Sequence, residues 1–178
     1  MTSEESRARF ARMARKYRIR DFFSPPGRIL AEAGIRAGDT VLDFGCGPGG
    51  FVAPAAKLVG GGGAVYALDR LREALDTVAG IVAKRRLMNV RTILSDCATG
   101  LPDGIVDVAL LYDTFHMLDP AECVLAELHR VLKEGGTLSF SDHHMKDDAI
   151  RSRVEAGGLF ELVGRKRKTY LFRRRSGA

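Results

Sequence analysis

A glycine-rich segment preceded by an acidic residue carries the clearest chemical signal in this sequence. Residues 41–50 read VLDFGCGPGG, an apolar run that leads into a glycine turn. Glycines allow a tight turn and a close approach of the backbone to a ligand, and a following helix presents unpaired N–H groups to a carboxylate or phosphate. Asp43 adds negative charge beside the turn, which favours a ligand with an ammonium or sulfonium group and opposes a pyrophosphate. Read as GxGxxG, Gly45, Gly47 and Gly50 also fit a dinucleotide site.

Two further carboxylates follow the next apolar runs. Asp69 comes after residues 64–68, where a carboxylate can accept both hydrogen bonds of a ribose diol; a helix N-cap before Leu71 is a compatible role. Asp96 comes after residues 90–94, where it can accept from the exocyclic amine of an adenine while the Cys97 N–H serves a ring nitrogen. The alternative is that Asp96 is only a loop acid. Together with Asp43, these residues predict a site for a nucleoside-containing ligand.

Histidines follow two later apolar runs. His116 comes after residues 105–111 and is our candidate general base or substrate contact, the alternative being a partly buried loop histidine. His143 and His144 come after residues 137–141. With Asp113 and Asp142 these histidines contain metal-ligand types, but no ligand spacing supports a metal, so we expect none. For Cys46 and Cys97 we expect packing without reactivity.

Strand and helix patterns alternate along the chain and must position these residues. Phe10, Met13, Ala14 and Tyr17 recur at helical spacing, which predicts an amphipathic helix over 4–20. A second helix is expected to have Ser24 as its N-cap and Pro25 at its first position, and to end at Gly34. Further helices are expected over 51–58, 71–82, 120–132 and 147–156. Strands are expected over 40–44, 64–68, 90–94, 105–111, 137–141, 159–163 and 169–173, with Gly135-Gly136 as a turn before the fifth.

This alternation predicts an α/β fold: a Rossmann-like, doubly wound, seven-stranded and mostly parallel sheet with helices on both faces. The last two strands are joined by a short connection, so they should form an antiparallel C-terminal hairpin. Ligands of such sheets bind beyond the carboxyl ends of the strands, where the strand order reverses. We therefore expect the site on the loops at 45–50, 69–71, 95–98, 112–116 and 141–145.

Length and composition fit one folded domain. The chain has 178 residues, of which 46% are hydrophobic and 28% charged, which excludes disordered and collagen-like classes. No apolar run reaches the about 20 residues of a membrane span, and the polar, acidic start is unlike a secretory signal. Three cysteines without CxxC spacing argue against a disulfide framework and favour a reducing cytoplasm.

The net charge of +6 is unevenly distributed. Residues 1–30 carry +5 and residues 151–178 carry +7, whereas residues 31–150 carry −6. Basic ends of this kind are compatible with an anionic partner such as a nucleic acid or a membrane surface. The alternative, which we favour because no recognised nucleic-acid module is present, is that they are solvated faces and a fraying tail.

Five segments in order resemble the class I S-adenosylmethionine-dependent methyltransferases, of the small type with a methyltransferase-11-like domain. The resemblance covers about residues 20–175. The glycine segment at 41–50 resembles the family's first motif, VYALDR at 65–70 the second and LSDCATGLP at 94–102 the third. VDVALLYDTFHML at 106–118 resembles the fourth, and LAELHRVLKEGGTLSFSD at 125–142 resembles the helix, double-glycine turn and strand that follow.

The resemblance implies methyl transfer from S-adenosylmethionine, which leaves as S-adenosylhomocysteine, to an unidentified acceptor. It implies cofactor contacts from Asp43, Gly45, Cys46, Gly47, Gly49, Asp69, Arg70, Asp96, Cys97 and Tyr112. His116, from its position after the fourth strand, is the candidate catalytic residue, and we expect no metal. Residues 1–34 are expected to be helices that cap the cofactor site, and residues 35–178 to be the methyltransferase domain. In line with the general chemistry of methyl transfer, the protein should mainly align donor and acceptor and exclude water.

The sequence departs from several branches of the family. Residues 112–115, YDTF, are not the Asn/Asp-Pro-Pro-Tyr clamp, which argues against methylation of DNA base amines. A long insert after the fifth strand is missing, so the Arg-rich N-terminal helix and Phe22-Phe23 are the candidate cover, or a second subunit of a homo-oligomer completes the site. We expect a small-molecule acceptor rather than a nucleic acid or protein, and no membrane partner. A nicotinamide- or flavin-dependent oxidoreductase and a non-catalytic S-adenosylmethionine-binding protein are the alternative functions.

Overall fold

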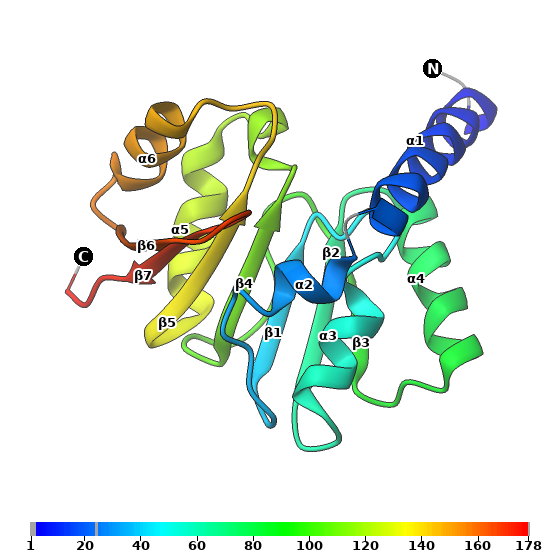
Figure 1. The fold of residues 1–178 in the computed structure, drawn as a ribbon, viewed down its shortest axis with the longest axis horizontal. Coiled ribbons are helices and arrows are strands. Elements are labelled where there is room, and N and C mark those ends of the chain that lie inside the picture. Colours follow the sequence, from blue (N-terminus) through cyan, green and yellow to red (C-terminus); the bar gives the residue numbers. More distant parts are fainter. Residues whose placement is uncertain (1–2, 24, 178) are drawn as a thin grey trace.

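The computed structural model describes residues 3–23 and 25–177, and contains one seven-stranded sheet flanked by helices (Figure 1). Side chains of residues 3–7, 18 and 21–23 are outside this description. The strands are β1 (Thr40–Phe44), β2 (Ala64–Asp69), β3 (Val90–Leu94), β4 (Val106–Tyr112), β5 (Leu132–Ser141), β6 (Phe160–Arg165) and β7 (Tyr170–Arg174). The helices are α1 (Ser3–Phe23), α2 (Pro26–Leu30), α3 (Val52–Val59), α4 (Arg72–Arg85), the short 3-10 helix η1 (Phe115–Met117), α5 (Ala121–Val131) and α6 (Asp147–Glu155).

The strand order is β3-β2-β1-β4-β5-β7-β6, so the predicted fold class is confirmed. β1 pairs in parallel with β2 on one side and β4 on the other, which makes the β1/β4 boundary the point where the order reverses. β7 is antiparallel to both β5 and β6, as the short connection between the last two strands predicts. The carboxyl ends of β1 to β4 thus meet at one edge, where the loops can share a ligand.

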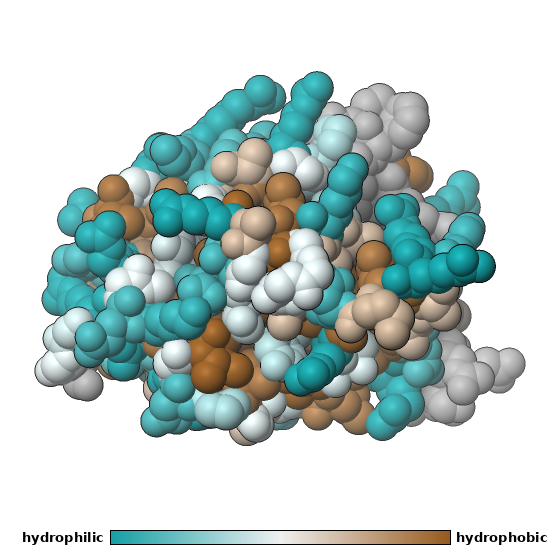
Figure 2. Space-filling model, turned by 90° about the horizontal axis from the view of Figure 1, so that it is seen from below, coloured by the Kyte–Doolittle hydropathy of each residue, from teal (hydrophilic) through white to brown (hydrophobic). Residues whose placement is uncertain are grey.

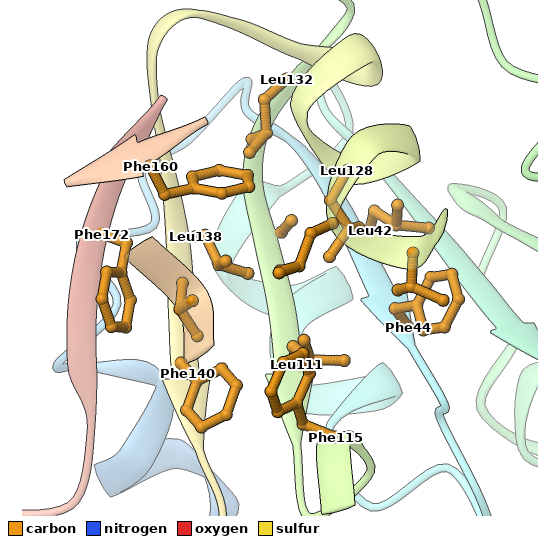
Figure 3. Close-up of a cluster of buried hydrophobic side chains, with 14 of the residues drawn as sticks. Leu42, Phe44, Leu111, Phe115, Leu128, Leu132, Leu138, Phe140, Phe160 and Phe172 are labelled. Atoms are coloured by element: carbon orange, nitrogen blue, oxygen red, sulfur yellow. The ribbon is translucent and has the colours of Figure 1, made fainter. Parts of the chain in front are cut away.

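Helices cover both faces of the sheet because alternate strand residues point to opposite sides. On one face Leu42 and Phe44 of β1 join a cluster with α5 and α6, which Figure 3 shows together with the phenylalanines of β5 and β7. On the other face Val41 packs with residues of α2 and α3, and Ala67 packs with α4. β1, β4 and β5 are therefore buried on both faces, and their end loops rest on a rigid support.

The structure differs from the sequence-based expectation at both ends of the second helix and around Gly135-Gly136. The helix is expected to end at Gly34, but α2 ends at Leu30 and residues 31–34 form a turn. Pro25 is the N-cap of α2 and Pro26 its first residue, whereas the expected cap, Ser24, is outside the described residues. The Gly135-Gly136 turn lies inside β5 rather than before it. Leu132 already pairs with β4, and pairing then breaks until Thr137, so the glycines turn the chain as an irregularity within the strand.

Figure 2 looks at the molecule from below and shows a mainly hydrophilic face with separate apolar patches. Within the described parts of the chain, no helix has the length and apolar character needed to cross a membrane. The opposite end, where α1 lies in Figure 1, holds the cavity described next.

Candidate functional site

A cavity of about 730 Å³ opens at the carboxyl edge of the sheet. The loops after β1, β2, β3 and β4 form its floor, and α1 contributes Arg9, Phe10, Met13, Tyr17 and Arg20. Residues between Met117 and Val124, before and within the start of α5, complete the lining. This volume is in the range of sites that enclose small molecules. The loop at 141–145 contributes no lining residue among those described.

The glycine loop after β1 is held against β2 by its backbone. The N–H groups of Gly45 and Cys46 both donate to the carbonyl of Leu68, at 2.8 and 2.9 Å. Gly45 has φ +75°, and a Cβ there would collide with the Thr114 side chain. The turn therefore requires glycine for its conformation and for the close approach of the loop after β4.

Asp69 connects the loops after β1 and β2. Its Oδ2 accepts from the Gly47 N–H and its Oδ1 from the Leu71 N–H, both at 2.9 Å. The side chain lines the cavity and the residue is 8% exposed. Since a carboxylate accepts about four hydrogen bonds, capacity remains for a ligand diol.

Asp43 is a buried carboxylate without a protein donor on one oxygen. The residue is 2% exposed, lines the cavity, and its Oδ2 has no hydrogen-bond partner. Burial, reinforced by the nearby charge of Asp69, raises the pKa of Asp43 to about 7. A ligand that brings a positive charge or a hydrogen-bond donor to a buried carboxylate of this kind stabilises its ionised form.

The loop after β3 is more open. Asp96 lines the cavity and is exposed, so its carboxylate is available to a ligand. The Cys97 N–H donates to Ser95 Oγ at 3.2 Å, so a ring nitrogen would have to share or replace that bond. Burial, with smaller contributions from Cys123, raises the pKa of the Cys97 thiol to about 12, and burial also raises the pKa of Cys46. Both thiols are protonated at neutral pH, which fits packing rather than nucleophilic roles.

The end of β4 brings an ion pair into the cavity. Tyr112 is buried, its hydroxyl lies 2.7 Å from Ser139 Oγ, and its ring contacts Phe51 edge-on. The next residue, Asp113, has φ +52°, in the left-handed region that few non-glycine residues adopt. Its Oδ2 lies 2.8 Å from Arg20 Nη1 of α1, and both residues line the cavity.

The cavity brings together nine of the predicted site residues. These are Asp43, Gly45, Cys46, Gly47, Asp69, Arg70, Asp96, Cys97 and Tyr112. Gly49 is not among the lining residues; a Cβ there would meet Val78 and Ile81 of α4, so this glycine allows helix packing. His116 also does not line the cavity. Its Nδ1 lies 2.9 Å from Asp142 Oδ2, and its ring lies against that of His144.

Further predictions concerned the cover of the site and a metal. Phe22 and Phe23, named as a cover for the site, have side chains outside those described. Among the described residues no three His, Cys, Asp or Glu side chains gather as metal ligands. The sequence places Asp113 on a site loop, and Tyr17 and Arg20 on the covering helix, but gives none of the three a role of its own. The position of Asp113 directly after a strand could have indicated a site residue, as the position of Asp69 at the end of a strand did. No sequence pattern could have indicated Arg20, because it lies 93 residues from its partner.

Comparison with known proteins gives one family. A family model described as a methyltransferase domain matches residues 35–168. The chain is 31% identical to aklanonic acid methyltransferase of a Streptomyces species, over 68% of this chain and 56% of that protein. It is 29% identical to 2-phytyl-1,4-naphtoquinone methyltransferase of Synechocystis, over 91% and 72%.

Solved structures agree with these relatives. A crystal structure of a SAM-dependent methyltransferase from Aquifex aeolicus superposes with a TM-score of 0.73 and 29% identity, covering 84% of this chain and 87% of that one. The chain spans between about a third and just over half of the length of several curated relatives that it matches.

Proposed function

This chain belongs to the class I S-adenosylmethionine-dependent methyltransferases, and we propose that it transfers the cofactor's methyl group to a small organic acceptor. The acceptor would enter between α1 and the loop after β4, both of which line the cavity together with the carboxylates at the ends of β1, β2 and β3. A small molecule is preferred to a macromolecule because α1 covers the site and leaves a cavity rather than an open groove.

The unpartnered, buried oxygen of Asp43 is the observation that carries this proposal. It lies in the cavity with Asp69, so two carboxylates approach each other where a ligand must bind. A dinucleotide would bring a pyrophosphate to this negative charge, at a Coulombic cost. S-adenosylmethionine instead carries an ammonium and a sulfonium, which fits an orphaned carboxylate.

We assign the remaining roles from the lining. The glycine loop of Gly45, Cys46 and Gly47 would hold the amino-acid end, Asp69 and Arg70 the ribose, and Asp96 with Cys97 the adenine. Tyr112 would support the cofactor from β4. Residues 1–34 would act as the cap, supported by the five α1 residues that line the cavity. The three free thiols support a reducing, cytoplasmic setting.

S-adenosylmethionine supplies, when bound, a methyl group already activated by its sulfonium. The chain then has three tasks: to bind the cofactor, to orient the acceptor and to exclude water. Asp69 and the glycine loop form a preorganised seat, since they are fastened to each other before any ligand arrives. α1 adds Met13 and Tyr17 to the wall of the cavity, and so limits the access of water.

Calorimetric titration tests this function. S-adenosylhomocysteine should bind with a 1:1 stoichiometry, whereas NADH and FAD should give no heat of binding. Asp43→Asn should weaken binding of S-adenosylhomocysteine by about tenfold or more, as expected for a lost charge-assisted hydrogen bond. The matched variant Asp76→Asn changes an exposed acid of α4 outside the cavity and should bind like the wild type. Tight NADH binding, or no binding of S-adenosylhomocysteine, contradicts the proposal.

A further inference from the structure

We propose that the acceptor is a planar aromatic compound with a neutral hydroxyl group, and that Asp113 takes the proton of that hydroxyl. This inference rests on the proposed methyltransferase function and names the substrate class of the same cavity. It follows from what lines the cavity on the β4 side, where Tyr17, Arg20, Phe51 and Asp113 come together.

Apart from Tyr112, the residues assigned to the cofactor do not come from β4 or the loop after it. The carboxylates assigned to the cofactor follow β1, β2 and β3, which lie consecutively on one side of the point where the strand order reverses. β4 lies on the other side of that point, and the loop after it meets the glycine loop, because Thr114 fills the space beside Gly45. An acceptor bound at the β4 loop would therefore lie next to the seat of the amino-acid end.

Flat groups pack against one another along this part of the wall. The Arg20 guanidinium lies 4.5 Å from the centre of the Tyr17 ring and 5.8 Å from that of Phe51. The Phe51 ring in turn lies 4.9 Å from that of Tyr112. Aromatic faces and a guanidinium plane bind other planar π-systems through stacking and cation–π contacts, but give a puckered saturated ring little beyond burial of its surface.

The ion pair on the β4 side of the cavity favours a neutral polar group beside it. Arg20 and Asp113 are paired at 2.8 Å, so together they present no net charge. An ammonium would be attracted by Asp113 and repelled by Arg20, and a carboxylate would experience the reverse. A neutral hydroxyl can donate to the Asp113 carboxylate without either penalty.

Asp113 has a free acceptor position and a route to solvent. Arg20 Nη1 donates to its Oδ2, and the Nδ1 and backbone N–H of His143 donate to its Oδ1 at 2.7 and 3.2 Å. A carboxylate accepts about four hydrogen bonds, so one position remains. The side chain of Asp113 is 12% exposed, and that of His143, which contacts it, is 54% exposed, so the carboxylate lies beside an imidazole that reaches water.

Asp113 and the cofactor together account for every atom and electron pair that moves in the methyl transfer. The hydroxyl proton moves to the Asp113 carboxylate as the acceptor oxygen bonds to the methyl carbon, and the electron pair of the broken carbon–sulfur bond stays on sulfur. The products are the methyl ether and a neutral thioether. Asp113 returns its proton to water at the rim beside His143. No oxidant or reductant is needed.

The test uses 2-naphthol and its saturated analogue decahydro-2-naphthol as probes on the full chain saturated with S-adenosylhomocysteine. We expect 2-naphthol to bind at least about tenfold more tightly than the saturated analogue. Tyr17→Leu should weaken 2-naphthol binding by about two- to tenfold. Tyr66→Leu is the matched control, because Arg91 lies over Tyr66 at 6.0 Å in a similar pair outside the cavity, and it should change nothing.

Asp113→Asn separates proton transfer from binding. With S-adenosylmethionine present, it should lower the rate of 2-methoxynaphthalene formation about 100-fold while the Kd of 2-naphthol stays within about fivefold. Equal binding of the two probes, no binding of 2-naphthol, binding without methylation by the wild type, or full turnover by Asp113→Asn each overturn the inference. Failure to bind S-adenosylhomocysteine in the first place overturns the proposed function instead, so the two failures are distinguishable.

Discussion

The backbone N–H of Gly47 donates a 2.9 Å hydrogen bond to Oδ2 of Asp69, so the loop after β1 is fastened to the end of β2. The other oxygen of the same carboxylate accepts from Leu71 at the start of the next loop. One side chain therefore sets the relative position of two loops that line the cavity. The residue proposed to bind the ribose also builds the seat for the rest of the cofactor.

Asp69→Asn should lower both stability and affinity. The amide keeps one acceptor oxygen but turns an NH₂ toward a backbone N–H, which leaves a donor unsatisfied. Loss of one hydrogen bond to a charged group predicts a fall of about 1–3 kcal/mol in the free energy of unfolding and a rise of about 10- to 100-fold in the Kd of S-adenosylhomocysteine. Urea denaturation and calorimetry measure the two effects. If the variant bound S-adenosylhomocysteine like the wild type, Asp69 would not be a cofactor-binding residue.

Asp43 predicts that the ligand-free protein loses stability as pH rises. Burial raises its pKa from 3.8 to about 7, so folding favours the protonated form. The stability from this group is fully present below about pH 4 and is lost as pH rises through about 7, with an upper limit of about 4 kcal/mol for a shift of this size. Asp43→Asn should remove this part of the pH dependence and be the more stable form at pH 8. If the free energy of unfolding of the two proteins, measured by denaturation, changed in the same way from pH 4 to 8, the result would contradict this prediction.

The same group predicts release of a proton on binding. If a cationic ligand group meets Asp43, the carboxylate is ionised in the complex but largely protonated in the free protein at pH 6. Titrations of S-adenosylhomocysteine at pH 6 in buffers of different ionisation enthalpy should show proton release, and Asp43→Asn should show less. A buffer-independent heat in the wild type would argue against a cation at Asp43.

Gly45→Ala should destabilise the protein through two separable effects. Gly45 has φ +75°, a conformation that costs an alanine about 1–2 kcal/mol, and the new Cβ would collide with the Thr114 side chain. Adding Thr114→Ala should recover the steric part and leave the conformational part. Gly61→Ala, where a Cβ meets open space, is the control and should change the free energy of unfolding by less than about 0.5 kcal/mol. No coupling in this cycle would contradict the contact.

Deletion of residues 1–20 should open the cavity. It removes Arg9, Phe10, Met13, Tyr17 and Arg20 from the wall and the ion pair of Arg20 with Asp113. The dissociation rate of S-adenosylhomocysteine should rise by about tenfold, equivalent to about 1.4 kcal/mol, since a lid slows ligand exit. Stopped-flow displacement measures this rate. An unchanged rate with unchanged 2-naphthol binding would show that α1 is not a cap.

The sequence predicts the strands and the carboxylates well because both depend on local patterns. Apolar runs such as Val41–Phe44 form buried strands, and the rule that ligands meet the carboxyl ends of parallel strands directs attention to Asp69 and Asp96. The antiparallel hairpin follows from the short connection between its two strands. The order of the strands, with β7 between β5 and β6, is not assigned from the sequence. The nine predicted residues that share one cavity all belong to such strand ends and loops.

The remaining features depend on tertiary contacts or local backbone geometry. Gly49 belongs to the same glycine run as Gly47, yet it faces α4, and only helix packing decides this. The pairing of Arg20 with Asp113 depends on where a separate helix docks. His116 and Met117 are neighbours in η1, whose 3-10 geometry turns successive side chains by about 120°, so one faces the cavity and the other does not.

The two candidate roles of His116, as a base and as a positioning residue, predict different results. As a base it would contact the acceptor; in the structure Met117 lines the cavity and His116 does not. Asp142 is buried and accepts from the backbone N–H of His116 at 3.0 Å and that of His144 at 3.1 Å, besides lying 2.9 Å from His116 Nδ1. This geometry indicates that the pair positions the loops after β4 and β5. Asp142→Ala should therefore cost about 2–4 kcal/mol of unfolding free energy, because it leaves several part-buried donors without their acceptor, and His116→Ala should cost less, since it removes one of them. Both should lower the thermal midpoint without weakening S-adenosylhomocysteine binding below that midpoint. A loss of turnover of about 100-fold in His116→Ala at unchanged stability would instead restore His116 as the base.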